Sequence, residues 1–392
     1  VGKQHVLTDD KDTRLYRQGR RYGAGKVLAV VAPGSLLEQW QVLQAAVDAD
    51  CIVIMQAANT GLTGGSTPFG DDYDRPVVLI STRRLVGIQV INDGQQVICL
   101  PGATLDRLEK ELVPFNREPH SVIGSSCIGA SVLGGVCNNS GGALVRRGPA
   151  YTELALYARV NDDGQLELVN HLGVNLGETP EEILSKLETK NYQIGDIINN
   201  SGCCASDHRY GHDVKQVDEN TPARFNADPS RLYEASGSAG KVCVFAVRLD
   251  TFEKIPSQVF YVGTNSHDDL TEIRRFLLKD LPRLPIAGEY IHRVAYDIGA
   301  EYGKDTFMFI EKLGTAKVPA AFAMKDKVDA YLEKFGVKGL SDKVLQLVTK
   351  FMPNHLPKRM NVFRDLYEHH LVIRIENQDV EQVESFLKRY FQ

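Results

Sequence analysis

The sequence predicts an α+β protein with a large amino-terminal domain and a smaller second domain that carries an insertion. Three observations support this fold class. Apolar runs alternate with amphipathic stretches from residue 26 onward, two long glycine-rich loops follow apolar runs, and a second set of strand and helix patterns starts near Phe252. At 392 residues the chain is too long for one ordinary core, which favours more than one domain.

The amino-terminal domain begins with a strand, a helix and a second strand. Residues 26–32 are an apolar run closed by Pro33 and Gly34, and they predict a buried strand. Ser35 is a typical N-cap and Glu38 follows three residues later, so residues 36–47 are predicted to form a helix. A second apolar run leads directly into the first glycine-rich loop. The pattern is that of a βαβ unit.

Further elements of this domain follow from the same rules. Asp162-Asp163-Gly164 predicts the turn of a hairpin, and the polar, glycine-punctuated stretch 191–218 predicts a long surface excursion. The predicted strands are 51–56, 77–81, 96–100, 155–160, 165–169 and 241–249, and the further predicted helices are 105–112 and 178–188.

The second domain reads as a split β-α-β…β-α unit. A helix over 268–278 lies between strands at 259–264 and 285–293, and a strand at 370–376 precedes a helix at 380–390. The predicted organisation is an amino-terminal domain over 1–251, a second domain in two parts over 252–302 and 365–392, and an insertion over 303–364.

The insertion differs from the rest of the chain in charge. It holds ten Lys and two Arg against four Asp and two Glu, a net charge of +6, whereas the whole chain carries −5. Aromatic and aliphatic residues such as Phe307 and Phe351 are mixed through it. Basic and apolar residues together favour a segment that lies on an anionic membrane surface. The alternative is an ordinary lysine-rich solvated face over a small core.

The two glycine-rich loops predict a ligand with an extended pyrophosphate. They span residues 59–66 and 124–142. Glycine allows close backbone approach, and successive N–H groups in such turns form nests for phosphate oxygens. Neither loop is a G-x-G-x-x-G fingerprint, and Ala130 stands where the Walker lysine would be, so ATP chemistry is not expected. Two nests in one domain favour a dinucleotide.

Composition excludes several other classes. A hydrophobic content of 43% and a charged content of 24% are typical of a soluble globular protein, and the net charge argues against nucleic acid as a partner. The seven cysteines are odd in number and form no C-x-x-C pair, which favours reduced thiols. Strand alternation places His369 and His370 on opposite faces, so we expect no metal site.

Long blocks of this sequence resemble a known family. QAANTGLTGGSTP, PGATL, EPHSVIGSSCIGASVLGGVCNNSGG and GSAGKVCVFAVRLDTF together resemble the FAD-binding domain of the vanillyl-alcohol-oxidase type. More narrowly, they are similar to the membrane-associated, quinone-dependent D-lactate dehydrogenases of bacteria, and GEYIHR, YGKDTF, HLPKRM and YEHHL extend the resemblance over essentially the whole chain. It implies a two-subdomain FAD-binding fold followed by a ferredoxin-like cap domain with a basic helical insertion.

The resemblance also implies the cofactor and its contacts. The first loop would cradle the FAD pyrophosphate and the second would complete the phosphate and isoalloxazine contacts. The first loop contains neither His nor Cys, which favours non-covalent FAD, with Cys127 the nearby alternative attachment point. The implied FAD contacts are Ala57, Ala58, Asn59, Thr60, Gly61, Leu62, Thr63, Gly65, Ser66, Gly124, Ser131, Gly141 and Val244.

The implied reaction is oxidation of D-lactate to pyruvate, with electrons passed to quinone, at the cytoplasmic face of the bacterial inner membrane. A 2-hydroxy acid needs a cation for its carboxylate and a base for its hydroxyl proton, and His292 and Arg293 are the candidates. Related chains continue beyond this length, so the chain reads as truncated at its carboxyl end. The alternatives are a flavin dehydrogenase of glycolate or another 2-hydroxy acid, and a catalytically silent flavin- or membrane-binding fragment.

Overall fold

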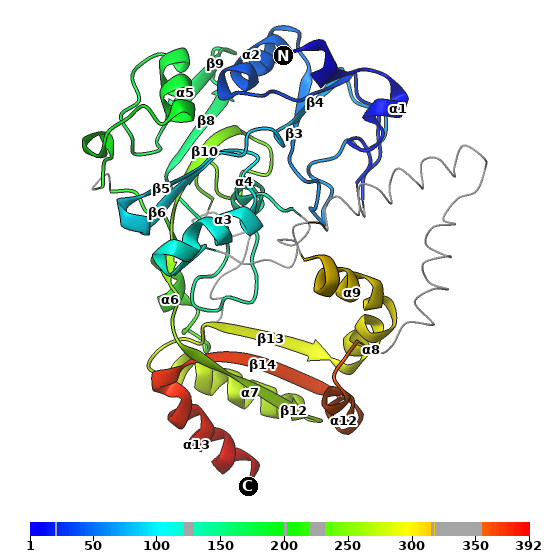
Figure 1. The fold of residues 1–392 in the computed structure, drawn as a ribbon, viewed down its shortest axis with the longest axis vertical. Helices are drawn as coiled ribbons and strands as arrows, with labels where there is room; N and C mark the ends of the chain where they lie inside the picture. The colour runs from blue at the N-terminus through cyan, green and yellow to red at the C-terminus, as the bar shows by residue number, and fades with distance from the viewer. Residues whose placement is uncertain (20–21, 121–128, 200–201, 220–231, 315–316, 318–354) are drawn as a thin grey trace, which may run out of the picture. The chain divides into compact units, whose positions relative to one another are not determined.

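The computed structural model describes residues 1–19, 22–120, 129–199, 202–219, 232–314, 317 and 355–392 (Figure 1). The chain divides into two compact units, which we call unit 1 and unit 2. Unit 1 comprises Val1–Gly142, Arg147–His208 and Arg224–Lys254, and unit 2 comprises Ala143–Arg146, Arg209–Ala223 and Ile255–Gln392. Two short segments of the predicted amino-terminal domain therefore belong to unit 2, which the sequence analysis did not predict.

Unit 1 begins with a small, mostly parallel sheet. Its strands lie in the order β1 (Val6–Leu7), β2 (Ala29–Val31), β4 (Val77–Ser81) and β3 (Ile52–Gln56). Both β2 and β3 run parallel to β4, so the two strands of the predicted βαβ unit are not neighbours. Helix α2 (Leu36–Asp48) connects them, and its predicted cap is confirmed, because Ser35 Oγ accepts from the Glu38 backbone N–H at 3.1 Å.

A five-stranded antiparallel sheet forms the larger part of unit 1. Its order is β5 (Ile88–Ile91), β6 (Gln96–Cys99), β10 (Cys243–Asp250), β8 (Ala155–Val160) and β9 (Leu166–Asn170). The predicted last strand is thus the central one, and its first seven residues are buried. The hairpin prediction is confirmed, with Gly164 at a φ of 76° between β8 and β9. Strand β5 was missed by the sequence analysis.

Both faces of this sheet are covered by helices, which explains why β10 is apolar on both sides. Phe245 and Leu156 point to a core shared with α2 and α5 (Pro180–Thr189). Val244 and Val247 point to a second core shared with α3 (Leu105–Leu112) and α4 (Val132–Cys137). The remaining elements of unit 1 are the helix α1 (Asp10–Thr13) and the two-stranded ribbon of β7 (Arg117–Glu118) and β11 (Phe252–Glu253).

Unit 2 is built on an antiparallel sheet of order β12 (Ser257–Thr264), β14 (His369–Glu376) and β13 (Ala287–His292). Helix α7 (His267–Arg275) continues into a π-helical turn over Phe276–Asp280, and α13 (Val380–Phe391) follows β14. Figure 1 shows α7 and α13 on one side of the sheet, and their shared core includes Ile273, Phe276, Ile373 and Val383. The predicted β-α-β…β-α order is therefore confirmed.

The other helices of unit 2 that the structure describes are α6 (Tyr210–Asp213), α8 (Arg293–Tyr302), α9 (Lys304–Leu313) and α12 (Lys358–Leu366). Helices α9 and α12 belong to the predicted insertion. Most of that segment lies outside the described residues, so its limits at 303 and 364 stay a prediction. The predicted surface excursion also needs correction. Ala205 within it is buried, and the Ile198 carbonyl accepts a bond from the buried Arg248, so part of the stretch packs into unit 1.

Candidate functional site

The first glycine-rich loop leaves the carboxyl end of β3, where buried Gln56 holds the far end of the loop and a neighbouring segment. Gln56 Nε2 donates to the Ser66 carbonyl at 2.7 Å and to the Tyr16 carbonyl at 2.8 Å. Inside the loop, Asn59 has a positive φ of 53°, and its Oδ1 accepts from Ser66 Oγ at 2.9 Å and Thr67 Oγ1 at 3.0 Å. Side-chain hydrogen bonds thus shape the loop without any help from a ligand.

The glycines of this loop differ in what they face. A Cβ on Gly61 would meet nothing within 4 Å, and on Gly65 only Asn138 Oδ1 at 3.9 Å. Gly64 has a φ of 78°, a backbone conformation that favours glycine over other residues. Packing among the described residues therefore does not explain Gly61 and Gly65. Open space beside glycines is what close approach of a phosphate-bearing ligand to the backbone requires. Seven of the nine predicted contacts between Ala57 and Ser66 lie on this loop, and Ala57 and Ala58 directly precede it.

The second glycine-rich loop is organised around the short helix α4. Ser131 caps it by accepting from the Gly134 backbone N–H at 3.1 Å. A Cβ on Gly141 would meet nothing within 4 Å, as at Gly61. Between them, Asn139 has a φ of 53° and a buried side chain, and neither of its amide atoms has a hydrogen-bond partner within the described ranges. A buried unpaired amide normally has a partner in the working molecule, so this group fits a ligand-binding loop.

The structure brings the two loops together within unit 1. A Cβ added to Gly65 in the first loop would lie 3.9 Å from Oδ1 of Asn138 in the second loop, so the two loops are neighbours at this point. Val244, predicted to give a backbone contact, lies in β10 with its side chain in the core, and its carbonyl accepts from Gln39 Nε2 at 3.4 Å. Gly124 and Cys127 lie outside the described residues. A site formed by both loops agrees with the prediction of one extended ligand.

His120, just before the second loop, was missed by the sequence analysis. It is 3% exposed, and neither ring nitrogen has a hydrogen-bond partner among the residues that the structure describes. Burial, and then the charge of Arg147, lower the pKa of His120 to about 4, because both disfavour the imidazolium. Its ring packs edge-on against Phe252, with ring centroids 5.9 Å apart. The sequence carries no signal for its burial, since the preceding Glu-Pro pair reads as a turn.

Of the predicted substrate-side residues, His292 ends β13 and Arg293 begins α8, so Arg293 is not in the strand as predicted. His292 Nδ1 accepts from the Val294 backbone N–H at 3.1 Å, which caps the helix. Its Nε2 is 3.0 Å from Glu368 Oε1, so Nε2 carries the proton and donates. This hydrogen bond is the main reason that the pKa of Glu368 is lowered. With both nitrogens engaged, His292 has no lone pair for a general base.

The adjacent histidines of β14 face opposite sides, which confirms the alternation argument. His369 lies beside His267 and His292, with ring centroids 4.2 and 5.5 Å apart, and its Nδ1 is 2.8 Å from Tyr290 Oη. His370 instead has its Nδ1 2.7 Å from Tyr261 Oη. Burial is the main cause that lowers the pKa of both imidazoles, so both are neutral near pH 7. His369 is the buried, neutral imidazole of this cluster.

The described part of the chain bears on metal binding and on membrane spanning. No group of three or more His, Cys, Asp or Glu side chains in this part of the chain could hold a metal ion. Among the helices that the structure describes, none combines the length and the apolar character needed to cross a membrane.

Two known families match separate parts of the chain. Residues 27–169 match the family described as an FAD binding domain, which confirms the predicted cofactor. Residues 259–392 match the family described as "D-lactate dehydrogenase, membrane binding". The first match contains the first loop and the described part of the second, and the other covers β12 through α13.

Solved structures share the fold at low sequence identity. An alkyldihydroxyacetonephosphate synthase aligns with a TM-score of 0.54 and 14% identity over 99% of this chain and 58% of its own. A p-cresol methylhydroxylase with substrate bound aligns with a TM-score of 0.51 and 12% identity over 100% of this chain and 62% of its own. With the FAD-domain match, these structures confirm the predicted α+β fold of the vanillyl-alcohol-oxidase type.

Curated relatives are far more similar in sequence. The quinone-dependent D-lactate dehydrogenase of Haemophilus influenzae is 58% identical over 394 aligned residues, which cover 100% of this chain and 70% of the relative. The quinone-dependent D-lactate dehydrogenase of Escherichia coli is 57% identical, again over 100% of this chain and 69% of the relative. The chain belongs to the family of quinone-dependent D-lactate dehydrogenases.

Proposed function

We propose that this chain oxidises D-lactate to pyruvate with FAD and passes the electrons to a membrane quinone. The observation that carries the proposal is identity of 57 to 58% over the full chain to quinone-dependent D-lactate dehydrogenases. The paired loops support it, since Gly61, Gly65 and Gly141 leave room for a ligand against the backbone. Bound FAD would supply the acceptor for the hydride that leaves the lactate C2 carbon.

The FAD contacts would come from unit 1. The first loop would hold the pyrophosphate through Ala57 to Thr63, Gly65 and Ser66, and the second would add Gly124, Ser131 and Gly141, with a backbone contact near Val244. FAD is held non-covalently, because the first loop offers no His or Cys as an attachment point. Acid precipitation tests this part: free flavin in the supernatant is the expected result, and flavin that stays with the protein would contradict it.

The substrate contacts would come from unit 2. Arg293 follows β13 directly and carries the cation that a 2-hydroxy acid needs for its carboxylate. His292 is suited to orient Glu368 and cap α8, because both its nitrogens are engaged. Removal of the hydroxyl proton needs an imidazole that is neutral near pH 7, and His369 has that property.

Steady-state kinetics of single variants test these roles. Arg293→Ala should lower kcat/KM for D-lactate by about a hundredfold or more, since a charged bidentate contact is lost, and Arg293→Lys should restore part of it. Unchanged kcat/KM in Arg293→Ala would remove Arg293 from the site. Flavin reduction by D-lactate but not by glycolate is the expected substrate preference, and the reverse preference would refute D-lactate as the substrate.

The membrane partner would be anionic lipid at the cytoplasmic face, and the basic insertion would bind it. Nucleic acid is not expected as a partner. Lys358 and Arg359 open α12, and the exposed apolar side chains of Val362 and Leu366 lie on the same helix. Lys343 and Lys350 of the insertion lie outside the described residues. A basic side chain near an anionic surface contributes about 1 kcal/mol.

Vesicle sedimentation tests this surface. Reversing Lys358 and Arg359 to Glu should weaken binding to phosphatidylserine-containing vesicles at least tenfold at low salt. Reversing Lys110 and Lys186, exposed lysines of unit 1, changes the net charge equally and should leave binding within about twofold. Equal loss in both double variants would show that only net charge matters, which contradicts the proposed surface.

A further inference from the structure

The second glycine-rich loop continues directly into a segment of unit 2. The loop belongs to unit 1 up to Gly142, the next four residues, Ala143–Arg146, belong to unit 2, and the chain returns to unit 1 at Arg147. Gly141 is therefore only two residues from the first residue of unit 2. Because a residue spans at most about 3.6 Å, a movement of Ala143 is passed on to Gly141 over a distance of only two residues.

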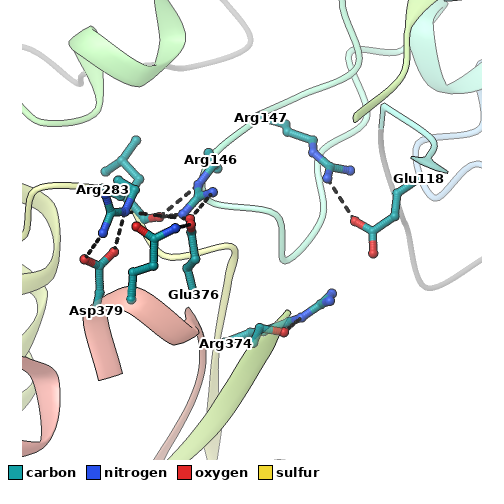
Figure 2. A network of polar contacts seen from close by, with 10 residues as sticks. Glu118, Arg146, Arg147, Arg283, Arg374, Glu376 and Asp379 are labelled. Atoms are coloured by element: carbon teal, nitrogen blue, oxygen red, sulfur yellow. Dashed lines mark hydrogen bonds and ion pairs between the residues drawn. The ribbon is translucent and has the colours of Figure 1, made fainter. Parts of the chain in front are cut away.

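The four-residue segment contacts β13 and the stretch of chain just before that strand. The Gly288 backbone N–H donates to the Ala143 carbonyl at 2.9 Å, and a Cβ on Gly288 would come within 3.3 Å of Val145. Arg146 makes the strongest contacts. Its Nε and Nη2 donate to the Leu284 carbonyl at 3.0 and 2.7 Å, and its Nη1 lies 3.1 Å from Glu376 Oε2 (Figure 2).

A second arginine, which lies outside this segment, pairs with the same buried acids. Glu376 and Asp379 are 8% and 3% exposed. Arg283 pairs with Asp379 through bonds of 3.0 and 2.7 Å, and its Nε is 3.8 Å from Glu376 Oε2 (Figure 2). Arg146 and Arg283 therefore both neutralise this acidic pair, but only Arg146 belongs to the segment that follows the loop.

The next residue along the chain is fastened within unit 1. Arg147 Nη1 donates to the Pro119 carbonyl at 2.8 Å, and its Nη2 is 2.9 Å from Glu118 Oε2. Its guanidinium also lies 4.3 Å from the centroid of the Phe252 ring. Figure 2 shows the two neighbouring arginines directed to separate partners, Arg146 to Glu376 and Arg147 to Glu118. Arg146 makes its charge-assisted hydrogen bonds within unit 2, and Arg147 makes its own within unit 1.

We propose that Arg146 is a positioning residue for the flavin: its contacts with Leu284 and Glu376 hold the end of the second glycine-rich loop in the conformation that binds FAD. Arg147 is fixed within unit 1, so the segment that follows the loop is anchored at Arg146 and again at the next residue. The buried, unpaired amide of Asn139 lies in this loop, four residues before Ala143, and needs a fixed loop to meet a ligand. The inference rests on the proposed function, because it takes FAD as the ligand.

The experiment compares Arg146→Ala with Arg283→Ala in the full chain. Each variant removes one cation from the same buried acids, so both should lose stability by a similar amount. The FAD dissociation constant, measured by flavin fluorescence on the apoprotein, should rise at least tenfold in Arg146→Ala and stay within twofold in Arg283→Ala. Arg146→Lys should recover part of the affinity. Hydrogen exchange of residues 138–146 in the apoprotein should quicken only in the Arg146 variants.

Equal changes in FAD affinity for the two alanine variants would overturn the inference, as would unchanged affinity in Arg146→Ala. Arg146→Gln retains one donor for the Leu284 carbonyl and serves if Arg146→Ala does not fold. Its FAD affinity should fall between those of the wild type and Arg146→Ala. Wild-type protein that binds FAD but is not reduced by D-lactate would refute the proposed function and leave this inference standing.

Discussion

His120 offers a prediction whose size follows from the structure. Its imidazole is buried, has no hydrogen-bond partner in the described part of the chain, and has a pKa of about 4, whereas an unfolded histidine titrates near 6.5. Between these pH values the unfolded chain binds a proton that folded unit 1 does not. Stability is therefore complete above about pH 6.5 and falls as the pH drops, by about 1.3 kcal/mol at pH 5.5 and about 3 kcal/mol below pH 4.

Replacement by Phe removes this titration. The ring keeps most of the volume beside Phe252, and two unpaired polar atoms leave the core, so His120→Phe should match or exceed wild-type stability at pH 7.5. At pH 5.5 the variant should gain a further roughly 1.3 kcal/mol relative to wild type.

Urea unfolding followed by Trp40 fluorescence measures the effect. Trp40 is the single tryptophan and lies in the core of unit 1, so its signal reports that unit alone. Phe252→Leu is the control, because it removes packing against the same histidine and should cost about the same at both pH values. A wild-type-minus-variant difference that is equal at pH 7.5 and 5.5 would refute the account of His120.

Two further predictions concern unit 1. Gly61→Val and Gly65→Val should stay within about 0.5 kcal/mol of wild-type stability but raise the FAD dissociation constant at least tenfold, because their Cβ positions face open space. Gly64→Ala, at a φ of 78°, should instead cost about 1 kcal/mol, and normal FAD affinity in Gly65→Val would contradict the loop assignment. Arg248→Met should destabilise unit 1 by roughly 3 kcal/mol or more, since buried Arg248 donates to Gln96, Gly173 and Ile198. Arg159→Met on the exposed face is its control, and equal losses in urea unfolding would be the contrary result.

Local elements were predictable from the sequence because their signals are local. Helix α3 has the predicted bounds, since Thr104 caps it and accepts from the Arg107 N–H at 3.3 Å. The hairpin of β8 and β9 follows from its Asp-Gly turn. Strand order was not predictable, because the position of β4 between β2 and β3 depends on pairing between distant segments. The short strand β5 lacks any flanking turn signal strong enough to mark it.

The candidate site likewise has parts that were predictable from the sequence and parts that were not. The glycine-rich loops were predictable from their composition, and the sequence blocks that resemble the family identify their ligand. The roles of Arg146, His120 and His369 were not predictable, because each depends on burial and on partners that are distant in the sequence. Arg146 illustrates the point: its acidic partner Glu376 is separated from it by 230 residues. The limit on His292 as a base likewise appears only from its two hydrogen bonds.

The most direct test of the central claim is an anaerobic titration of the purified, FAD-loaded chain with D-lactate. The account predicts loss of the flavin absorbance with one pyruvate formed per FAD, and reoxidation on addition of a quinone analogue. L-lactate at the same concentration should leave the spectrum unchanged. Flavin that binds stoichiometrically but is not bleached by D-lactate would contradict the account.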